Sequence, residues 1–459
     1  MHELTAARAQ KSISRFSMAP HQALFHSVDC IRSVRYRTDA DADGKHNRCC
    51  VAANGHFLTS HVDEVLIDNA ESTGNELLET SNATRALLYS RMMSPSRAVP
   101  APAYVRSVGT ATPETRYTKA ECLDAFQKSD WFSRLDARSH FIARTVLQRD
   151  NGIEARRLAV SSLEEVFTID PDTLSKRFLK HAPLIAAQAA ERALAKSALA
   201  VQAIDAVVVS TCTGYVCPGL SGYVIERLGL RADVQAFDLV GQGCAAALPN
   251  MQLGRALLAS GACENVLSIC VEISSAAMYL DNDPGVLISA CLFGDGAGAA
   301  VLSRDAAPGG RRIEWTDSAS LIEPAERKAL MFEHKDGMLR NVLTRAVPAL
   351  AADYAHRVLD IVLDRAGLGV EDIDAWIMHA GGRDVLLALA REFDLNSARD
   401  FRYSAAMLRE YGNLSSAFVY FVLDAALADD APDGWWWLSS FGAGFSCHGA
   451  LLKVGSAPL

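Results

Sequence analysis

The sequence lacks the excess of basic residues that nucleic-acid-binding proteins carry. Its 459 residues include 45 Lys and Arg against 54 Asp and Glu, a formal net charge of −9. This balance argues against nucleic acid or an anionic membrane surface as the main partner. The sequence also lacks a membrane span. The longest uncharged run considered, GWWWLSSFGAGFSCHGALL (434–452), is interrupted by Gly, Ser and His and predicts strand, turn and strand.

The cysteines lack the density and spacing of a disulfide framework, because the 11 of them are scattered through apolar segments. With no recognisable secretion signal, this predicts a cytoplasmic protein. Cys49, Cys50, His56 and His61 are conceivable metal ligands, but adjacent cysteines do not match the usual spacing of zinc sites, and we expect no metal. Neither GQG nor GDGAG opens a helix with the full dinucleotide fingerprint, which argues against NAD and FAD.

Patterning divides the chain into three parts. Residues 1–100 are polar, show little periodicity and end in a Pro-rich stretch, which predicts a poorly ordered extension. From residue 101, strand and helix patterns alternate, which predicts an α/β protein with helices covering its sheets. A helix, the strand AIDAVVV and a loop in 101–305 are echoed by a helix, DIDAWIMH and a loop in 306–459. We therefore expect two similar halves.

Cys244 lies where a strand pattern changes to a helical one. It follows the β-forming run VQAFDLV (234–240) and precedes AAALPNMQLGRALL (245–258), which is rich in helix formers. A thiol at a helix N-terminus lies near unpaired N–H groups and the positive end of the helix dipole, which lowers its pKa and makes it a nucleophile. The alternative is a buried structural cysteine.

Two further polar residues occupy similar positions. His379 ends the strand pattern IDAWIMH and precedes AGG, where absent side chains let a ligand approach closely. Asn413 lies in YGNLSSA, at a predicted helix start. Taken alone, His379 fits a neutral core histidine and Asn413 fits an N-cap. Together with Cys244, and with small residues around all three, they predict a shared site.

The region from about residue 103 to 459 resembles the type III polyketide synthases, the chalcone and stilbene synthase family, which includes bacterial members. The motifs that carry the resemblance are QGCAA around Cys244, SACLFGDGAGAAVL with Phe293, HAGGRDVL with His379, YGNLSSAFVYFVLD with Asn413, and SSFGAGF near the end of the chain. Ser440 and Ala443 in the last motif depart from the family's loop. The resemblance implies a thiolase-like α/β fold of two similar βα halves, with helices sandwiched between and around mixed sheets.

The resemblance also implies the chemistry. An acyltransferase of this type performs iterative decarboxylative Claisen condensation of malonyl-CoA onto an acyl-CoA starter held on Cys244, then cyclises the chain to a pyrone or a phenolic product. His379 and Asn413 donate hydrogen bonds to the malonyl thioester carbonyl, and a protonated His379 lowers the pKa of the Cys244 thiol. Phe293 forms an apolar wall near the group that loses CO2, with core packing as the alternative. The implied substrates are CoA thioesters, no cofactor is needed, and the active unit is a homodimer.

The substrate-binding residues carried over from the family are Ser274, Cys217, Gly337 and Ser415. Ser274 and Ala277 stand where plant relatives have two threonines, and Cys217 stands where they have the methionine that crosses the dimer interface. The stretch DGMLRNVLTRAVP (336–348) is shorter than theirs and has no aromatic residue. These smaller side chains in the cavity wall predict a roomier apolar cavity. They favour a long aliphatic starter over a flat aromatic one.

The basic residues that meet the CoA phosphates are not fixed by a motif. Arg144, Arg149, Arg156 and Arg157 lie in the appropriate region, and solvated surface charge is an equally good interpretation. Two other functions stay open. One is a single-condensation β-ketoacyl synthase of the same fold, against which HAGG and SSAFVYFVLD argue. The other is a catalytically silent acyl-binding scaffold, against which the intact Cys, His and Asn argue.

Overall fold

The computed structural model describes residues 36–37, 50–53, 56–57, 102–429 and 431–456. Contacts group the chain into two units, Met1–Pro95 and Ser96–Leu459. The first unit contains a small antiparallel sheet of β1 (Tyr36–Arg37), β2 (Cys50–Ala53) and β3 (His56–Phe57). The rest of the predicted extension, Cys49 and His61 included, lies outside the described residues.

Five strands make up the first half of a nine-stranded sheet in the second unit. In spatial order they are β4 (Tyr104–Ala111), β10 (Gly296–Ser303), β9 (Asn265–Glu272), β7 (Ala206–Ser210) and β8 (Gln235–Leu239). Neighbours are antiparallel from β4 to β9, and parallel from β9 to β8. The apolar run AIDAVVV and the segment around GDGAG form β7 and β10, in which every residue is buried.

Four strands make up the second half and repeat this order. They are β11 (Arg311–Ile322), β16 (Ser446–Ser456), β15 (Gly434–Gly442) and β14 (Ile373–Met378). The pairs β11–β16 and β16–β15 are antiparallel and β15–β14 is parallel, as in β4–β10–β9–β7. The two halves expected from the sequence therefore share one topology. The predicted boundary at 305/306 falls in the connection between β10 and β11 and stays a prediction, because contact grouping leaves Ser96–Leu459 undivided.

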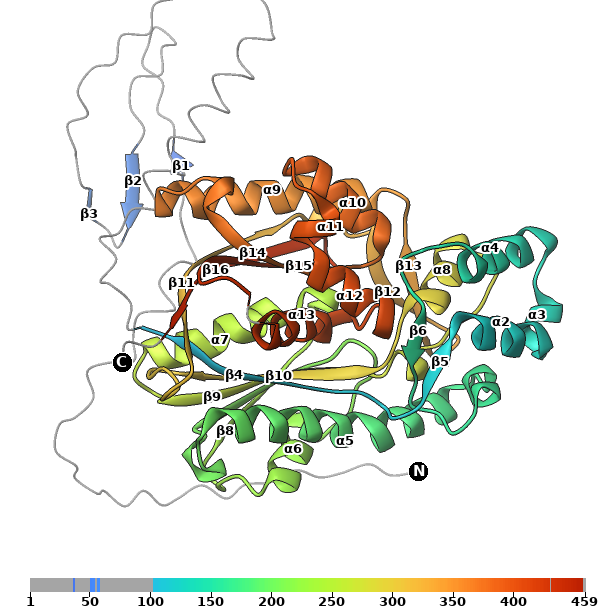
Figure 1. Cartoon of the computed structure of the whole chain (residues 1–459), viewed down its shortest axis with the longest axis horizontal. Helices are drawn as coiled ribbons and strands as arrows, with labels where there is room; N and C mark the ends of the chain where they lie inside the picture. Colours follow the sequence, from blue (N-terminus) through green and yellow to red (C-terminus); the bar gives the residue numbers. More distant parts are fainter. Residues whose placement is uncertain (1–35, 38–49, 54–55, 58–101, 430, 457–459) are drawn as a thin grey trace, which may run out of the picture. The chain divides into compact units, whose positions relative to one another are not determined.

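Helices form layers between and outside the two parts of the sheet (Figure 1). Between them lie α7 (Ala247–Ala259) and α13 (Phe418–Ala428), each in contact with strands of both halves. Outside the first half lie α5 (Pro171–Ser197) and α6 (Leu220–Leu228); outside the second lie α9 (Val347–Ala366) and α10 (Arg383–Glu392). The sequence of α13, FVYFVLDAALA, is apolar nearly all round, as a helix enclosed on every side requires.

One side of the layers carries elements inserted into the two halves, at the right of Figure 1. They are α2 (Lys119–Lys128), α3 (Asp130–Arg134), α4 (Ala137–Gln148), α8 (Pro284–Leu292), the hairpin of β5 (Arg116–Thr118) with β6 (Ala155–Arg157), and the hairpin of β12 (Leu330–Lys335) with β13 (Met338–Leu343). The short α11 (Ser397–Asp400) and α12 (Arg402–Tyr411) lead from α10 to α13. Helix α8 contacts both α4 and β13, so these elements can wall a cavity beside the layers.

The apolar segment 434–452 is part of the core. It forms β15, a turn and most of β16, as its Gly, Ser and His residues predict. Trp436 and Trp437 of β15 are fully buried, together with Phe418 and Tyr420 of α13. Among the described residues, no helix combines the length and the apolar character that crossing a membrane requires.

Candidate active site

Cys244, His379 and Asn413 come from three distant segments and line one cavity of about 580 Å3, together with Phe293. Cys244 lies just before α7, His379 just after β14, and Asn413 just before α13. Because α7 and α13 lie between the two parts of the sheet, the short turns that precede them are in contact. The structure therefore brings together the three residues that the sequence singles out.

The turn that carries Cys244 is tightly enclosed. Gly243 has a left-handed φ of 55°, which favours glycine, and a Cβ there would lie 2.9 Å from the Cβ of Ala443. On the same side, a Cβ on Gly442 would lie 2.5 Å from the backbone nitrogen of Ala245. Ser440 Oγ donates to the Ala245 carbonyl at 2.9 Å. The connection from β15 to β16 thus fixes the position of the thiol.

The Cys244 thiol is buried and accepts a hydrogen bond from Ser415 Oγ at 3.2 Å. Burial raises the pKa of this thiol to about 12, although the bond from Ser415 acts in the opposite direction. The lowered pKa predicted from the helix start is therefore wrong for this structure. Desolvation outweighs the helix dipole here, and Cys244 is a neutral thiol near pH 7.

His379 is held by its backbone and by two rings. Its N–H donates to the Ser439 carbonyl at 2.9 Å, and its imidazole lies 5.5 Å from the ring of Phe418 and 4.9 Å from that of Phe441, centroid to centroid. Nδ1 is buried and has no partner among the described residues. Burial lowers the pKa of His379 to about 3, so the imidazole is neutral at pH 7. The expected protonated His379 is therefore also wrong for the resting enzyme.

Asn413 has both of its amide atoms engaged. Oδ1 accepts from the backbone N–H of Ser415 at 2.8 Å, and Nδ2 donates to the Gly381 carbonyl at 3.2 Å. The first bond stabilises the turn before α13, which is the capping role considered as the alternative. The second bond is to Gly381, two positions after His379, and it leaves the other proton of Nδ2 available to the cavity that Asn413 lines. The structure thus supplies both a local structural role and a free donor.

Phe293 follows α8 and is tied to Asn413. Their backbones form a parallel bridge in which Asn413 N–H donates to Leu292 O at 2.9 Å and Gly294 N–H donates to Asn413 O at 3.0 Å. Arg156 is buried and its Nη1 donates to the carbonyls of Ala290 and Phe293 at 2.7 and 3.1 Å. These bonds fix the end of α8 beside the site. Arg156, a candidate for the CoA phosphates in the sequence, instead supports Phe293.

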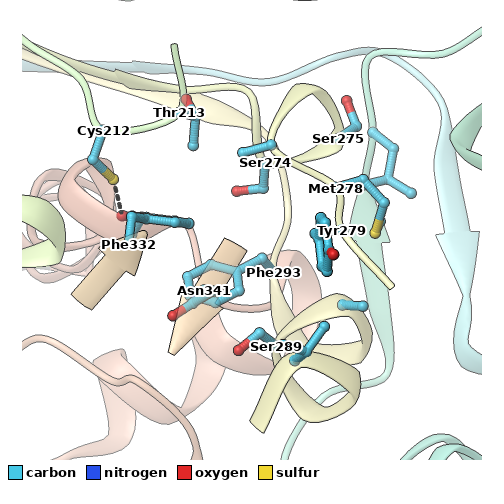
Figure 2. Close-up of a pocket in the computed structure, with 15 residues that line it drawn as sticks. Cys212, Thr213, Ser274, Ser275, Met278, Tyr279, Ser289, Phe293, Phe332 and Asn341 are labelled. Carbon is cyan, nitrogen blue, oxygen red and sulfur yellow. Dashed lines mark hydrogen bonds between the residues drawn. The ribbon is translucent and has the colours of Figure 1, made fainter. Parts of the chain in front are cut away.

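A second, narrower cavity of about 40 Å3 adjoins the first (Figure 2). Phe293 and Asn341 line both cavities. Ser274 and Ala277 line the narrow one, as the sequence predicts, but they do not make it roomy. Phe332 of β12 and Tyr279 supply aromatic walls that the stretch 336–348 lacks. The expected roomier apolar space is therefore absent beside Ser274 and Ala277. In the larger cavity, the stretch 336–348 does supply apolar wall residues, namely Leu343, Val347 and Pro348.

A buried carboxylate that no sequence motif indicates lies beside the narrow cavity. Glu272 ends β9 with no exposed surface and accepts hydrogen bonds from the Ser416 hydroxyl, from Thr213 Oγ1 at 2.9 Å, and from the Cys212 backbone and thiol at 3.1 and 3.2 Å. Burial raises the pKa of Glu272. Ser415 Oγ lies 3.3 Å from this carboxylate as well as 3.2 Å from Cys244 Sγ, and its single proton can serve one of them at a time.

Two family models match most of the second unit. Residues 107–312 match the FAE1/type III polyketide synthase-like protein family, and residues 318–454 match the C-terminal domain of chalcone and stilbene synthases. The chain belongs to the type III polyketide synthase family. It is therefore an acyltransferase-type enzyme, for which CoA thioesters are fitting substrates.

This synthase is similar to several named proteins and solved structures. It is 28% identical over 372 residues to the 3,5-dihydroxyphenylacetyl-CoA synthase of Streptomyces toyocaensis, covering 78% of this chain and 92% of the relative. Among solved structures, it matches PKS-I of the brown alga Ectocarpus siliculosus with a TM-score of 0.70 and 25% identity, over 78% of this chain and 100% of that one. The 1,3,6,8-tetrahydroxynaphthalene synthase of Streptomyces coelicolor matches with a TM-score of 0.68 and 24% identity, over 77% and 100%, and bears on the fold alone. The layered architecture is thus the expected thiolase-like fold.

The remaining predicted site residues of this synthase lie apart or differ in role. Ser415 lines the narrow cavity, whereas Gly337, in the turn between β12 and β13, and the exposed Cys217 line neither cavity. Among the arginines, Arg149 lines the larger cavity, while Arg144 lies over the Phe132 ring.

Arg157 pairs with Glu410 at 3.0 Å and does not line the larger cavity. Arg345 and Arg383, which sequence reasoning missed because they belong to the second half, line this cavity with Arg149. No group of three or more His, Cys, Asp or Glu side chains able to hold a metal ion occurs in the part of the chain that the structure describes.

Proposed function

We propose that this synthase performs iterative decarboxylative condensation of malonyl-CoA onto an acyl group carried by Cys244. The observation that supports this best is the meeting of Cys244, His379, Asn413 and Phe293 on one 580 Å3 cavity. Thiolate chemistry on acyl groups needs a nucleophile, a proton acceptor and donors for an oxyanion, and these side chains are of the required types.

In the loading step, the Cys244 thiol attacks the thioester carbonyl of the starter. The C–S bond to CoA breaks, CoA leaves as its thiol, and an acyl–Cys244 thioester forms. Because both groups are neutral at rest, His379 acts as the base that accepts the thiol proton and keeps it, while the leaving CoA takes its proton from solvent. Its Nδ1 is buried in the interior, so Nε2 is the nitrogen that accepts the thiol proton. Ser415 Oγ, 3.2 Å from the sulfur, stabilises the developing thiolate.

In the extension step, the malonyl thioester loses CO2 as its C–C bond breaks, and the electron pair becomes an enolate. The Nε2–H that His379 gained from Cys244 and the free Nδ2 proton of Asn413 donate hydrogen bonds to the enolate oxygen. The carbanion then attacks the acyl–Cys244 carbonyl and expels the thiolate, which leaves a CoA-bound chain two carbons longer. Phe293 gives the departing carboxylate an apolar surface, which favours its conversion to neutral CO2 as the negative charge moves to the enolate.

The size of the narrow cavity bears on the length of the starter. The sequence favoured a long aliphatic acyl group, but the narrow cavity of about 40 Å3 holds little more than water-sized groups. Relatives from Streptomyces and Amycolatopsis are named for a CoA-linked dihydroxyphenyl product. We therefore propose a short acyl starter and a phenolic product, with a long aliphatic starter as the competing outcome and a pyrone as the competing product.

The three arginines on the larger cavity suit the CoA phosphates. Arg149, Arg345 and Arg383 are exposed, and the pantetheine arm would pass between them toward Cys244. Arg383 already pairs with Asp150 at 3.5 Å, so Arg149 and Arg345 carry more of this role. This assignment keeps Arg149 from the set expected from the sequence and puts Arg345 and Arg383 in place of the other three arginines.

Mass spectrometry of products from malonyl-CoA with a panel of acyl-CoA starters tests the proposal. We expect products that contain two or more malonyl-derived units. A single extension, with an acyl-carrier-protein substrate only, favours the β-ketoacyl synthase. Absence of any product or adduct with every acyl-CoA favours the silent acyl-binding scaffold.

We also propose that the active unit is a homodimer, as the family resemblance implies. The loop after β7 supports it, because the Tyr215 side chain is 81% exposed beside the exposed Cys217. Light scattering on the active protein is expected to give twice the chain mass. A monomer mass with full activity contradicts the dimer.

A further inference from the structure

The hairpin of β12 and β13 buries an amide where an apolar side chain would be expected. Asn341 is the one residue of β13 classed as buried, at 9% exposure, while Val342 and Leu343 beside it stay partly exposed. Its Oδ1 has no hydrogen-bond partner among the described residues. Burying an amide without partners costs free energy, and native proteins rarely keep such groups without a function.

Asn341 lies at the junction of the two cavities. It lines both the 580 Å3 cavity that contains Cys244 and the narrow cavity next to it, as Phe293 does. In Figure 2 it lies near Phe293, and Ser274 lies across the pocket. Ser274 Oγ is also buried without a partner. Two residues with unsatisfied polar atoms therefore line a pocket whose walls also include the apolar Phe293, Phe332 and Met278 and several hydroxyl side chains.

The position of this amide is fixed by its hairpin. Asn341 pairs with Phe332 across the hairpin, and the neighbouring Arg340 binds Asp281, Asp283 and Glu333 at 3.0, 3.1 and 2.8 Å. These contacts anchor β13 to the segment before α8. An anchored amide loses little conformational freedom when a ligand binds, which suits a specificity-determining group.

We propose that Asn341 is a specificity-determining residue that binds the oxygen atoms of a β-ketoacyl chain, an inference that rests on the proposed function. An amide offers Oδ1 to an enol hydroxyl and Nδ2 to a ketone oxygen, so it matches either form of a β-keto group. A chain built from malonyl units has an oxygen on alternate carbons. An alkyl chain has none and leaves the amide unpaired, which a buried site disfavours. Asn341 thus favours partly extended chains over saturated ones of equal length.

The test compares acetoacetyl-CoA with butyryl-CoA, two four-carbon thioesters that differ by the β-keto oxygen. The rate of adduct formation on Cys244 is followed by intact mass in the wild type and in Asn341→Leu, which keeps the shape but not the hydrogen bonds. We expect the preference for acetoacetyl-CoA to fall on the order of tenfold in Asn341→Leu, mainly through slower acetoacetyl loading. Differences in intrinsic thioester reactivity cancel in this ratio.

Two further variants separate binding from folding. Asn341→Gln keeps the amide and is expected to retain part of the preference. Ser139→Ala removes another buried hydroxyl without a partner, on α4 and outside both cavities, and is expected to leave the preference unchanged. We also expect Asn341→Leu not to lower the melting temperature, since it removes an unsatisfied group. A lower melting temperature with an unchanged preference overturns the proposal and makes Asn341 structural.

Malonyl-CoA added to the same samples keeps the two proposals apart. Extended products together with an unchanged preference overturn the role of Asn341 and leave the proposed function standing. A changed preference without extended products supports the role of Asn341 and contradicts iterative condensation. No adduct with either thioester overturns both.

Discussion

The two halves of the fold place different chemistry at equivalent points. In the first half, the turn before α7 carries Cys244, and the segment after β7 carries Cys212. In the second half, the turn before α13 carries Asn413 and Ser415, and the segment after β14 carries His379. The shared topology therefore brings two helix starts and two strand ends to one place, and the side chains at these points decide the chemistry.

The difference between the halves separates the nucleophile from the groups that serve it. The first half supplies thiols, and the second supplies the imidazole, the amide and the hydroxyl that contacts Cys244. Of the two thiols, Cys212 donates to the Glu272 carboxylate, whereas Cys244 accepts a bond from Ser415. The equivalent points of the two halves are thus not interchangeable, and variants can test each one.

The largest effect is expected from the two thiols of the first half. Cys244→Ala should abolish acyl loading, while Cys212→Ala should keep it. Burial and the nearby Glu272 raise the pKa of Cys212 well above its ordinary value. Cys212 also lines the narrow cavity, whereas His379, the base, lines the larger cavity with Cys244. Intact-mass measurement after incubation with acyl-CoA detects the adduct. An adduct that survives in Cys244→Ala and maps to Cys212 contradicts the assignment.

A smaller, selective effect is expected in the second half from Asn413→Ala. Release of CO2 from malonyl-CoA should fall on the order of 100- to 1000-fold, as when one oxyanion donor is lost. Acyl loading on Cys244 should change little, because Asn413 has no charge to offer the thiol. Labelled CO2 and the rate of iodoacetamide alkylation follow the two steps separately. Asn396→Ala removes an N-cap of the same half, before α11 and away from the cavities, and is the matched control. Equal damage to both steps in Asn413→Ala means that this residue serves only the turn that holds Ser415.

The smallest effect concerns stability against acid. Burial lowers the pKa of His379 to about 3, so below pH 6.5 the unfolded chain takes up a proton that the folded chain does not. Stability present above pH 6.5 is therefore lost as the pH falls toward 3. At pH 5 this loss is about 2 kcal/mol, and His379→Gln should remove it. Urea unfolding at pH 7 and pH 5 measures the difference, with the exposed His334→Gln as control. Equal acid sensitivity in wild type and His379→Gln implies that His379 is protonated in the folded state.

Much of the fold could be predicted because its signals are local. Local composition alone indicates the environment of three segments: the buried strand AIDAVVV, the apolar helix α13 and the interrupted run 434–452. The meeting of Cys244, His379 and Asn413 was predictable through the motifs around them. The pKa directions were not, because they depend on burial by distant segments such as Phe441 and Phe418, which enclose His379.

Other features of the site could not be predicted for the same reason. Glu272, Phe332 and Asn341 stand in ordinary strand sequences. Only the tertiary structure brings Phe332 and Asn341 to the narrow cavity and bonds Glu272 to its wall residue Cys212. The roomy pocket was expected from small residues at two positions, without the aromatic walls that other segments contribute. The sequence shows which side chains are present, but the volume of a cavity depends on all the side chains that surround it in the folded protein.

The contact between the β15–β16 connection and the turn of Cys244 has a consequence for how this sequence can evolve. Gly243 and Ala443 are 200 positions apart, yet there is room for one side chain between them. The alanine at 443 can exist because residue 243 has none. A side chain at 243 would therefore need the one at 443 to be lost and would still have to adopt the left-handed φ of 55°, so the alanine of one segment depends on the glycine of the other.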